Sequence, residues 1–247
     1  MSNGFLGLAP EERIITALDM PRDEAIALAD KLAGTATWLK VGMTLYYKEG
    51  PQIVSELQER GFKVFLDLKF HDIPHQVRGA AKSAVASGAD MLTMHTVGAA
   101  EMCRAAREGA EEAACEAGRE TPVTLGITVL TSMDADALAS TGVTRPVVEQ
   151  VRALAGIAKE AGLSGVVASP QEAAMLREVL GPDAYIVTPG VRPAGAALGD
   201  QKRVATPARA VADGASHIVV GRPITQADDP VAVFNAIAEE LREGVSL

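Results

Sequence analysis

The sequence is poor in the residues that mark several large classes of protein. Only two of its 247 residues are cysteine, Cys103 and Cys115, and 4% are aromatic. Both cysteines fall in an Ala- and Glu-rich stretch that favours helix, and twelve residues of helix would separate them by ~18 Å, too far for a disulfide. We therefore expect two reduced thiols and a reducing compartment.

Positive charge and long apolar runs are equally scarce. The chain has 23 Lys and Arg against 32 Asp and Glu, a net charge of −9, which argues against binding to nucleic acid or to an anionic membrane surface. A small anionic ligand stays possible, because a few local cations can hold one. No apolar run reaches membrane-spanning length, and the first ten residues lack the order of a secretory signal. We expect a cytoplasmic protein that binds neither nucleic acid nor membrane.

Apolar residues are abundant, at 48%, and they occur in short runs that alternate with helical stretches. Strands are expected at residues 14–19, 38–42, 63–69, 90–95, within 122–130, and at 165–168, 184–188 and 217–221. Helices are expected at residues 21–33, 51–60, 74–87, 99–117, 145–161, 170–180 and 230–242. This order predicts the α/β class and a single-domain (β/α)8 TIM barrel over residues 1–247, with the barrel at about 14–242. A doubly wound open sheet is the alternative, but the first strand-to-helix turn lacks the Gly-rich dinucleotide fingerprint.

The stretch FLDLKFHDIP, residues 65–74, places charges on a strand that otherwise belongs to a core. It contains the pattern Asp-x-Lys-x-x-Asp at Asp67, Lys69 and Asp72. Because side chains alternate along a strand, Phe65, Asp67 and Lys69 should share one face. By itself this could be a buried ion pair with a purely structural role.

Polar residues recur where the other strands end, which is where such barrels carry their active sites. This convergence favours a functional cluster over a structural one. The residues are Asp19, Lys40, Asp67, Lys69, His95, Thr131, Arg192, Gly221 and Arg222.

The loop after the seventh strand, residues 188–203, is longer than its neighbours and carries Arg192 and Gln201. Loops of this length often act as lids, and the loops after strands seven and eight commonly bind phosphate. Gly221 and Arg222 fit such a site, although Arg222 could also be an ordinary surface arginine. His71 and His75 flank Pro74 and therefore lack mid-helix spacing, so we expect no zinc site. His95 and His217 should be packed or hydrogen-bonded.

The charge cluster suits one kind of chemistry. A lysine held between carboxylates stays an ammonium, which can deliver a proton. A fixed carboxylate beside it repels an anionic group on the substrate, and loss of that group as CO2 relieves the repulsion. The lysine would stabilise the resulting carbanion and protonate it, while phosphate contacts anchor the substrate. These residues therefore suit a decarboxylase of a phosphorylated substrate.

The stretch at 65–74 resembles the signature of the orotidine 5′-phosphate decarboxylase family. The segments TPGVRP (188–193), GDQKR (199–203) and VGRPI (220–224) are similar to its phosphate-binding elements. The segments ALD (17–19) and LKVG (39–42) match as well, and the resemblance runs in order from Ile14 to Leu241. It implies conversion of orotidine 5′-phosphate to UMP and CO2, the last step of de novo UMP synthesis, without cofactor or metal.

The resemblance also implies roles for individual residues. Lys69 would protonate C6, Asp67 would face the substrate carboxylate, and Lys40 and Asp72 would complete an alternating charge network. In this family the second Asp enters the site of the other subunit, so Asp72 implies a homodimer with shared active sites.

Substrate binding would involve further positions. Asp19 and Lys40 would contact the ribose hydroxyls, Thr131 would lie near the pyrimidine, and Gln201 would reach from phosphate to base. The phosphate would be held by Arg192, Gly221 and Arg222, and Ile73 would also belong to the substrate site. The sequence departs from the family at His75-Gln76, where Asn-Thr is common, so a glutamine side chain replaces the threonine of the family at position 76.

Two rival readings remain. Related sugar-phosphate enzymes such as 3-keto-gulonate 6-phosphate decarboxylase share Asp-x-Lys-x-x-Asp but use Mg²⁺ and a Glu at the end of strand two, where this chain has Lys40. A nucleotide-binding barrel without catalysis is the non-enzyme rival, which Lys69, Asp67 and Asp72 together disfavour.

Overall fold

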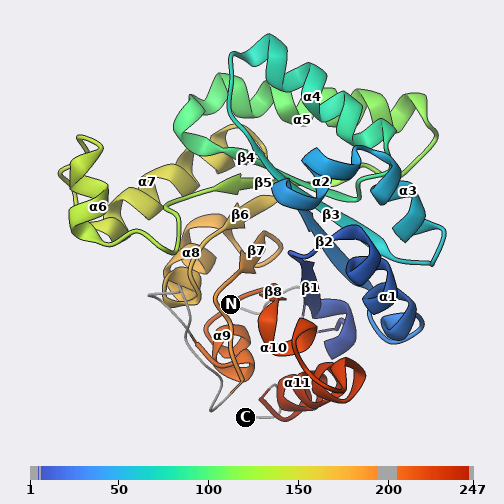
Figure 1. The fold of residues 1–247 in the computed structure, drawn as a ribbon. Coiled ribbons are helices and arrows are strands. Elements are labelled where there is room, and N and C mark those ends of the chain that lie inside the picture. Colours follow the sequence, from blue (N-terminus) through green and yellow to red (C-terminus); the bar gives the residue numbers. More distant parts are fainter. Residues whose placement is uncertain (1–4, 6, 194–204, 245–247) are drawn as a thin grey trace.

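Eight parallel strands close into a barrel, and helices surround it on the outside (Figure 1). The computed structural model describes residue 5, residues 7–193 and residues 205–244. The strands are β1 (Ile14–Leu18), β2 (Trp38–Gly42), β3 (Lys63–Phe70), β4 (Met91–His95), β5 (Val123–Ile127), β6 (Gly165–Val167), β7 (Tyr185–Thr188) and β8 (His217–Val220). Each strand pairs with the next in the sequence, and β8 pairs with β1. The predicted (β/α)8 barrel is confirmed.

The α-helices are α1 (Arg22–Leu32), α2 (Met43–Glu49), α3 (Gln52–Gln58), α4 (Pro74–Ala86), α5 (Ala99–Glu116), α6 (Ala135–Ser140), α7 (Val147–Glu160), α8 (Ala173–Leu180), α9 (Pro207–Ala212), α10 (Arg222–Thr225) and α11 (Pro230–Gly244). Short 3₁₀ helices are η1 (Pro10–Arg13), η2 (Thr96–Gly98) and η3 (Pro170–Glu172). The sequence pattern does not predict α2, α6, α9 or α10, which have four to seven residues and show little periodicity, although it does predict the equally short α3. Within the described ranges, no helix is long and apolar enough to cross a membrane.

The helices begin and end where local chemistry favours it. Pro74 occupies the first position of α4, where its missing N–H is not needed. The side chains of Asp134 and Thr206 accept hydrogen bonds from backbone N–H groups at the starts of α6 and α9. Gly50 and Gly181 follow α2 and α8 with φ of 72° and 95°, a conformation that glycine adopts without strain.

Side chains of the strands alternate between the barrel interior and the layer beneath the helices. On β1, Ile14 and Leu18 pack outward, whereas Ile15 and Ala17 point inward. The barrel is thus a packed core, which leaves its polar groups to the strand ends. The buried interior residues are Ile15, Ala17, Trp38, Phe65, Met91, Leu125, Val187 and Val219.

Thr16, at the centre of β1, is buried, and within the described part of the chain its hydroxyl has no hydrogen-bond partner. An unsatisfied buried hydroxyl costs ~1–3 kcal/mol, and valine has nearly the same shape without it. We expect Thr16→Val to raise the free energy of unfolding by about 1 kcal/mol in a denaturant titration. The matched control is Thr124→Val, which should destabilise because the Thr124 hydroxyl lies 3.3 Å from Ser164 Oγ. Unchanged or lower stability of Thr16→Val would contradict this reading.

The amino-terminal end of the barrel is closed by an aromatic cluster around His217. Its ring stacks on Tyr185 with centroids 5.3 Å apart, and Phe5 meets it edge-on at 5.7 Å. Its Nδ1 lies 3.1 Å from Ser216 Oγ. Burial, together with the nearby charge of Arg13, lowers the pKa of His217 to about 3, so the ring is neutral at physiological pH. His217 is packed and hydrogen-bonded, as the sequence predicts.

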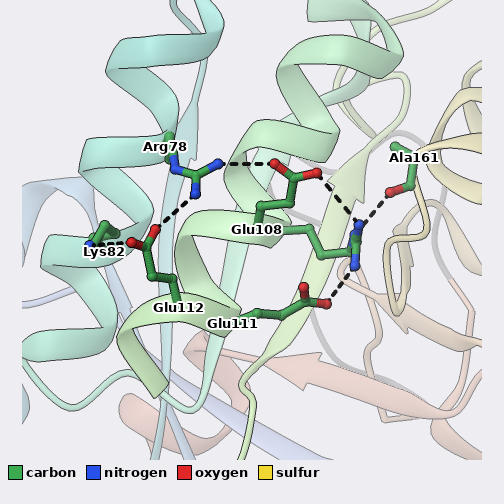
Figure 2. Close-up of polar contacts among 7 residues, drawn as sticks. Arg78, Lys82, Glu108, Glu111, Glu112 and Ala161 are labelled. Carbon is green, nitrogen blue, oxygen red and sulfur yellow. Dashed lines mark hydrogen bonds and ion pairs between the residues drawn. The ribbon is translucent and has the colours of Figure 1, made fainter. Parts of the chain in front are cut away.

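Helices α4 and α5, which follow β3 and β4, are held together by an ion-pair network (Figure 2). Arg78 on α4 reaches Glu108 at 3.0 Å and Glu112 at 2.9 Å on α5, and Lys82 reaches Glu112 at 3.1 Å. A Cβ added at Gly109 would lie 2.4 Å from the carbonyl oxygen of Arg78, so only glycine permits this close helix packing. Each exposed pair contributes little alone. Together they link the two helices that follow β3 and β4.

Candidate active site

A cavity of about 710 Å³ opens at the carboxyl ends of the strands, where barrels of this type carry their active sites. Its volume lies in the range of small-molecule sites. A local excess of positive charge in a chain of net charge −9 favours an anionic ligand. The walls carry four cationic and three acidic side chains, which are Lys40, Lys69, Arg192, Arg222, Asp19, Glu24 and Asp67.

Asp67 on β3 is the centre of a charge cluster in this cavity. Its Oδ2 accepts a hydrogen bond from Lys69 Nζ at 2.7 Å and lies 3.8 Å from Lys40 Nζ. Lys40, on the neighbouring β2, also donates to Asp19 Oδ1 at 3.1 Å, just past β1. Side-chain exposure is 65% at Asp19 but only 25% at Lys69, 14% at Asp67 and 10% at Lys40. Three adjacent strands thus bring together four of the predicted site residues.

The charge state of Asp67 follows from competing effects. Burial by itself raises the pKa of this carboxyl. The ammonium groups of Lys40 and Lys69, and hydrogen bonds from Lys69 and Thr93, act in the opposite direction and outweigh burial. The pKa of Asp67 therefore lies below its ordinary value, and Asp67 is a carboxylate at neutral pH. A fixed negative charge can in this way be kept beside a bound anion.

The backbone at Lys69 departs from a regular strand. Lys69 has a φ of 53°, in the left-handed region, which costs a non-glycine residue ~1–3 kcal/mol. Leu66 pairs with Leu92 and Phe70 with Met94, so residues 67–69 of β3 face the single residue Thr93 of β4. Simple alternation predicts an uninterrupted strand here; the structure instead has a bulge. Bulges of this kind re-aim side chains next to active sites.

Thr93 and Gly42 belong to the site although sequence reasoning missed them. The Thr93 hydroxyl accepts the Lys69 backbone N–H at 2.9 Å and donates to Asp67 Oδ1 at 2.9 Å. A Cβ at Gly42 would lie 3.1 Å from Asp19 Oδ1 and 3.2 Å from Lys40 Nζ, so a larger residue would crowd that ion pair. The available signal for Thr93 was its inward parity, two positions after Met91.

The side of the cavity near β7 and β8 holds the residues predicted for phosphate. Arg192, Gly221 and Arg222 all line the cavity there. Thr131, which follows β5, also lines the cavity. The Arg192 backbone N–H donates to the Ala205 carbonyl at 3.0 Å, which joins the two described ends of the long loop. Gln201 lies outside the described residues, as does most of the predicted lid.

Asp72 and Ile73 lie outside the cluster within this one chain. Asp72 is exposed, and its Oδ1 accepts the Ile73 backbone N–H at 2.6 Å. Neither residue lines the cavity described here. Of the expected Lys40–Asp67–Lys69–Asp72 network, the described residues of this one chain bring together the first three, so Lys69 contacts one carboxylate rather than two. Ile73 leaves 62% of its surface exposed, which is unusual for a large apolar side chain.

His95, the last residue of β4, lies beside His71. The rings of His71 and His95 lie 5.6 Å apart. Burial, and then the neighbouring His71 and Lys69, lower the pKa of His95, which keeps this half-buried ring neutral at physiological pH. In the part of the chain that the structure describes, no three His, Cys, Asp or Glu side chains are grouped to hold a metal ion.

Comparison with known proteins agrees with this geometry. Residues 12–237 match the model of the orotidine 5′-phosphate decarboxylase / HUMPS family. The chain belongs to this family. A curated orotidine 5′-phosphate decarboxylase from Moorella thermoacetica is 50% identical over 234 residues, which cover 94% of this chain and 92% of that protein. The decarboxylase from Halorhodospira halophila is 52% identical over 230 residues, with coverage of 93% and 95%.

The fold of the family is the same barrel. The crystal structure of orotidine 5′-phosphate decarboxylase from Lactobacillus acidophilus superimposes with a TM-score of 0.83 at 39% identity, covering 93% of this chain and 99% of that one. The resemblance that the sequence motifs suggest is confirmed.

Proposed function

We propose that the cavity is the active site of an orotidine 5′-phosphate decarboxylase, which converts orotidine 5′-phosphate to UMP and CO2 in pyrimidine synthesis. The observation that carries this proposal is the Lys40–Asp67–Lys69 cluster in the cavity of a chain about half identical to known decarboxylases. The direct test is turnover of orotidine 5′-phosphate by the purified protein. Both cysteines are free thiols, which favours a reducing compartment. Together with the biosynthetic reaction, this favours a cytoplasmic location.

The cluster suggests how the bond is broken. With Asp67 ionised, the substrate carboxylate is bound next to a like charge, and this repulsion decreases as CO2 departs. The bond between C6 and the carboxylate carbon breaks, and its electron pair stays on C6. The Lys69 ammonium stabilises that charge and transfers a proton from Nζ to C6. Water then returns a proton to Lys69. No step requires a cofactor or a metal.

Remote contacts supply the binding energy that opposes this repulsion. In the proposal, Arg192, Gly221 and Arg222 hold the phosphate, while Asp19 and Lys40 hold the ribose hydroxyls. The pyrimidine lies near Thr131. Gly221 lines the cavity, and a Cβ there would meet only Ala17 at an ordinary 3.6 Å, so packing alone does not require glycine. Close approach of phosphate to the backbone is a reason for it.

We expect Arg222→Ala to weaken phosphate-bearing ligands selectively. Loss of a charged hydrogen bond costs ~1.5–3 kcal/mol, which corresponds to about 10- to 150-fold in the Kd of UMP. Uridine, which lacks the phosphate, should bind nearly as it does to the parent protein. Calorimetric titration of both ligands measures the two changes. Arg209→Ala, which removes an exposed arginine of α9 paired with Asp213, is the matched control. Equal weakening of UMP and uridine would rule out this role for Arg222.

The proposal includes a homodimer with shared sites. Asp72 and Ile73 follow β3 on the same rim as Met43 and Tyr47 of α2 and Val97 of η2, which follow the adjacent β2 and β4. Tyr47 is 73% exposed, and Met43, Ile73 and Val97 are also exposed apolar residues. Exposed large apolar side chains at the ends of neighbouring strands favour a protein interface on this rim. In the proposed dimer, a second subunit docked on this rim places its own Asp72 and Ile73 at this cavity.

The sugar-phosphate rival is less well supported. A metal-dependent site needs a divalent cation beside the carboxylates at the ends of β1 and β3. Lys40 Nζ lies 3.1 Å from Asp19 Oδ1 and 3.8 Å from Asp67 Oδ2, so its ammonium occupies the position between these two carboxylates. A second cation there would be repelled. The same argument favours an enzyme that works with the charges of its own side chains.

A further inference from the structure

Thr93 connects the two central groups of the charge cluster from beneath. It is completely buried on β4 and does not line the cavity, so it cannot touch a bound substrate. Its hydroxyl nevertheless contacts both Lys69 and Asp67. These contacts lie on the inward side of the bulge, where three residues of β3 face Thr93 alone.

The direction of both hydrogen bonds is fixed by chemistry. A backbone N–H can only donate, so the Thr93 oxygen accepts from Lys69. The single hydroxyl proton is then free for the Asp67 carboxylate, at 2.9 Å from Oδ1. The other carboxylate oxygen, Oδ2, is left to the two lysine ammonium groups. One hydroxyl therefore assigns each oxygen of Asp67 to a different set of partners.

The same hydroxyl supports the strained backbone of Lys69. The Lys63 N–H bonds Thr37 on the β2 side, and the Val64 carbonyl accepts from Asp90 on the β4 side, so a regular strand would turn the Lys69 N–H toward β2. The bulge turns it toward β4 instead, away from that ladder. With φ at 53°, the conformation of Lys69 persists only if its surroundings hold it. The Thr93 oxygen satisfies the displaced N–H, which would otherwise be buried without a partner.

We propose that Thr93 is a positioning residue for decarboxylation, which holds Lys69 in its left-handed conformation and turns Asp67 Oδ2 toward the two lysines. This inference rests on the proposed roles of Lys69 and Asp67. A hydroxyl is required at this position, and the methyl group is not. Serine therefore retains the function, whereas the nearly isosteric valine does not.

The test compares Thr93→Val with Thr93→Ser in the full-length protein. We expect Thr93→Val to lower kcat about 10- to 100-fold, the effect of losing one hydrogen bond to a charged group, and to change UMP affinity less than threefold. Thr93→Ser should keep at least a third of the parent kcat. Because the Thr93 hydrogen bond lowers the pKa of Asp67, the acid limb of the kcat/KM profile of Thr93→Val should move to higher pH. If Thr93→Val fails to fold, Thr93→Ala carries the same expectation.

Controls separate positioning from stability and from the chemistry itself. Thr124→Val removes a bonded, buried hydroxyl of β5 that faces Ser164, and it should lower stability without changing kcat or the pH profile. Two results would overturn the role of Thr93, provided that Lys69→Ala is inactive. One is a kcat of Thr93→Val within threefold of the parent kcat. The other is an equal loss of kcat in the serine and valine variants. Turnover in Lys69→Ala would instead overturn the proposed chemistry, and this inference with it.

Discussion

Lys69→Ala should reduce turnover of orotidine 5′-phosphate by at least ~10⁴-fold, because it removes both the proton donor and the charge that stabilises the carbanion. UMP binding should persist, since the arginines and the ribose contacts are untouched. Loss of the ammonium also leaves Asp67 beside the substrate carboxylate without its 2.7 Å partner. Absorbance assays at enzyme concentrations up to micromolar measure residual turnover, and calorimetry measures UMP binding.

The matched control for this substitution lies on the same strand. Lys63, at the opposite end of β3, rests over the Trp38 ring at 5.6 Å and is remote from the cavity lining. Lys63→Ala should retain parental turnover. If Lys69→Ala kept more than about a hundredth of the parental rate, a general acid at Lys69 would be untenable, because such groups typically contribute 10²–10⁴-fold.

Mixing two inactive variants should restore about a quarter of the parental activity. In the proposed dimer, each site takes Lys69 from one subunit and Asp72 from the other. A Lys69→Ala and an Asp72→Ala subunit then form a heterodimer with one intact site and one doubly altered site. Random exchange makes half of the dimers mixed, so about one site in four is intact. Activity is measured after subunit exchange at equal concentrations.

The control for subunit exchange is a Lys69→Ala/Asp72→Ala double variant. Paired with either single variant, it leaves no intact site and should restore nothing. Native mass spectrometry verifies that mixed dimers form. Exchange without any return of activity would show that Asp72 does not act across an interface, and its exposed position in the chain would then need another explanation.

The barrel was predictable from the sequence because its signal is repeated along the chain. Eight short apolar runs, separated by helical stretches, leave few alternative topologies. Short helices such as α2 and α9 escaped, since six or seven residues carry too little periodicity. The Lys40, Asp67 and Lys69 cluster was also predictable, because the ends of neighbouring parallel strands must meet at one rim.

What escaped prediction depends on local backbone geometry. Alternation gives the face of a side chain only while the strand stays regular, and at Lys69 it does not. Thr93 reads as an ordinary buried strand residue until the bulge brings the Lys69 N–H to it. The placement of Asp72 is a further case. Its motif predicts membership of the cluster, but one chain alone leaves it exposed.

The most direct test of the central claim is the absorbance change of orotidine 5′-phosphate on incubation with the purified parent protein, with and without EDTA. The account predicts stoichiometric conversion to UMP at the same rate in both conditions, since the reacting charges belong to Lys40, Asp67 and Lys69. Absence of turnover, or turnover that EDTA abolishes and Mg²⁺ restores, would contradict it and favour a metal-dependent sugar-phosphate enzyme.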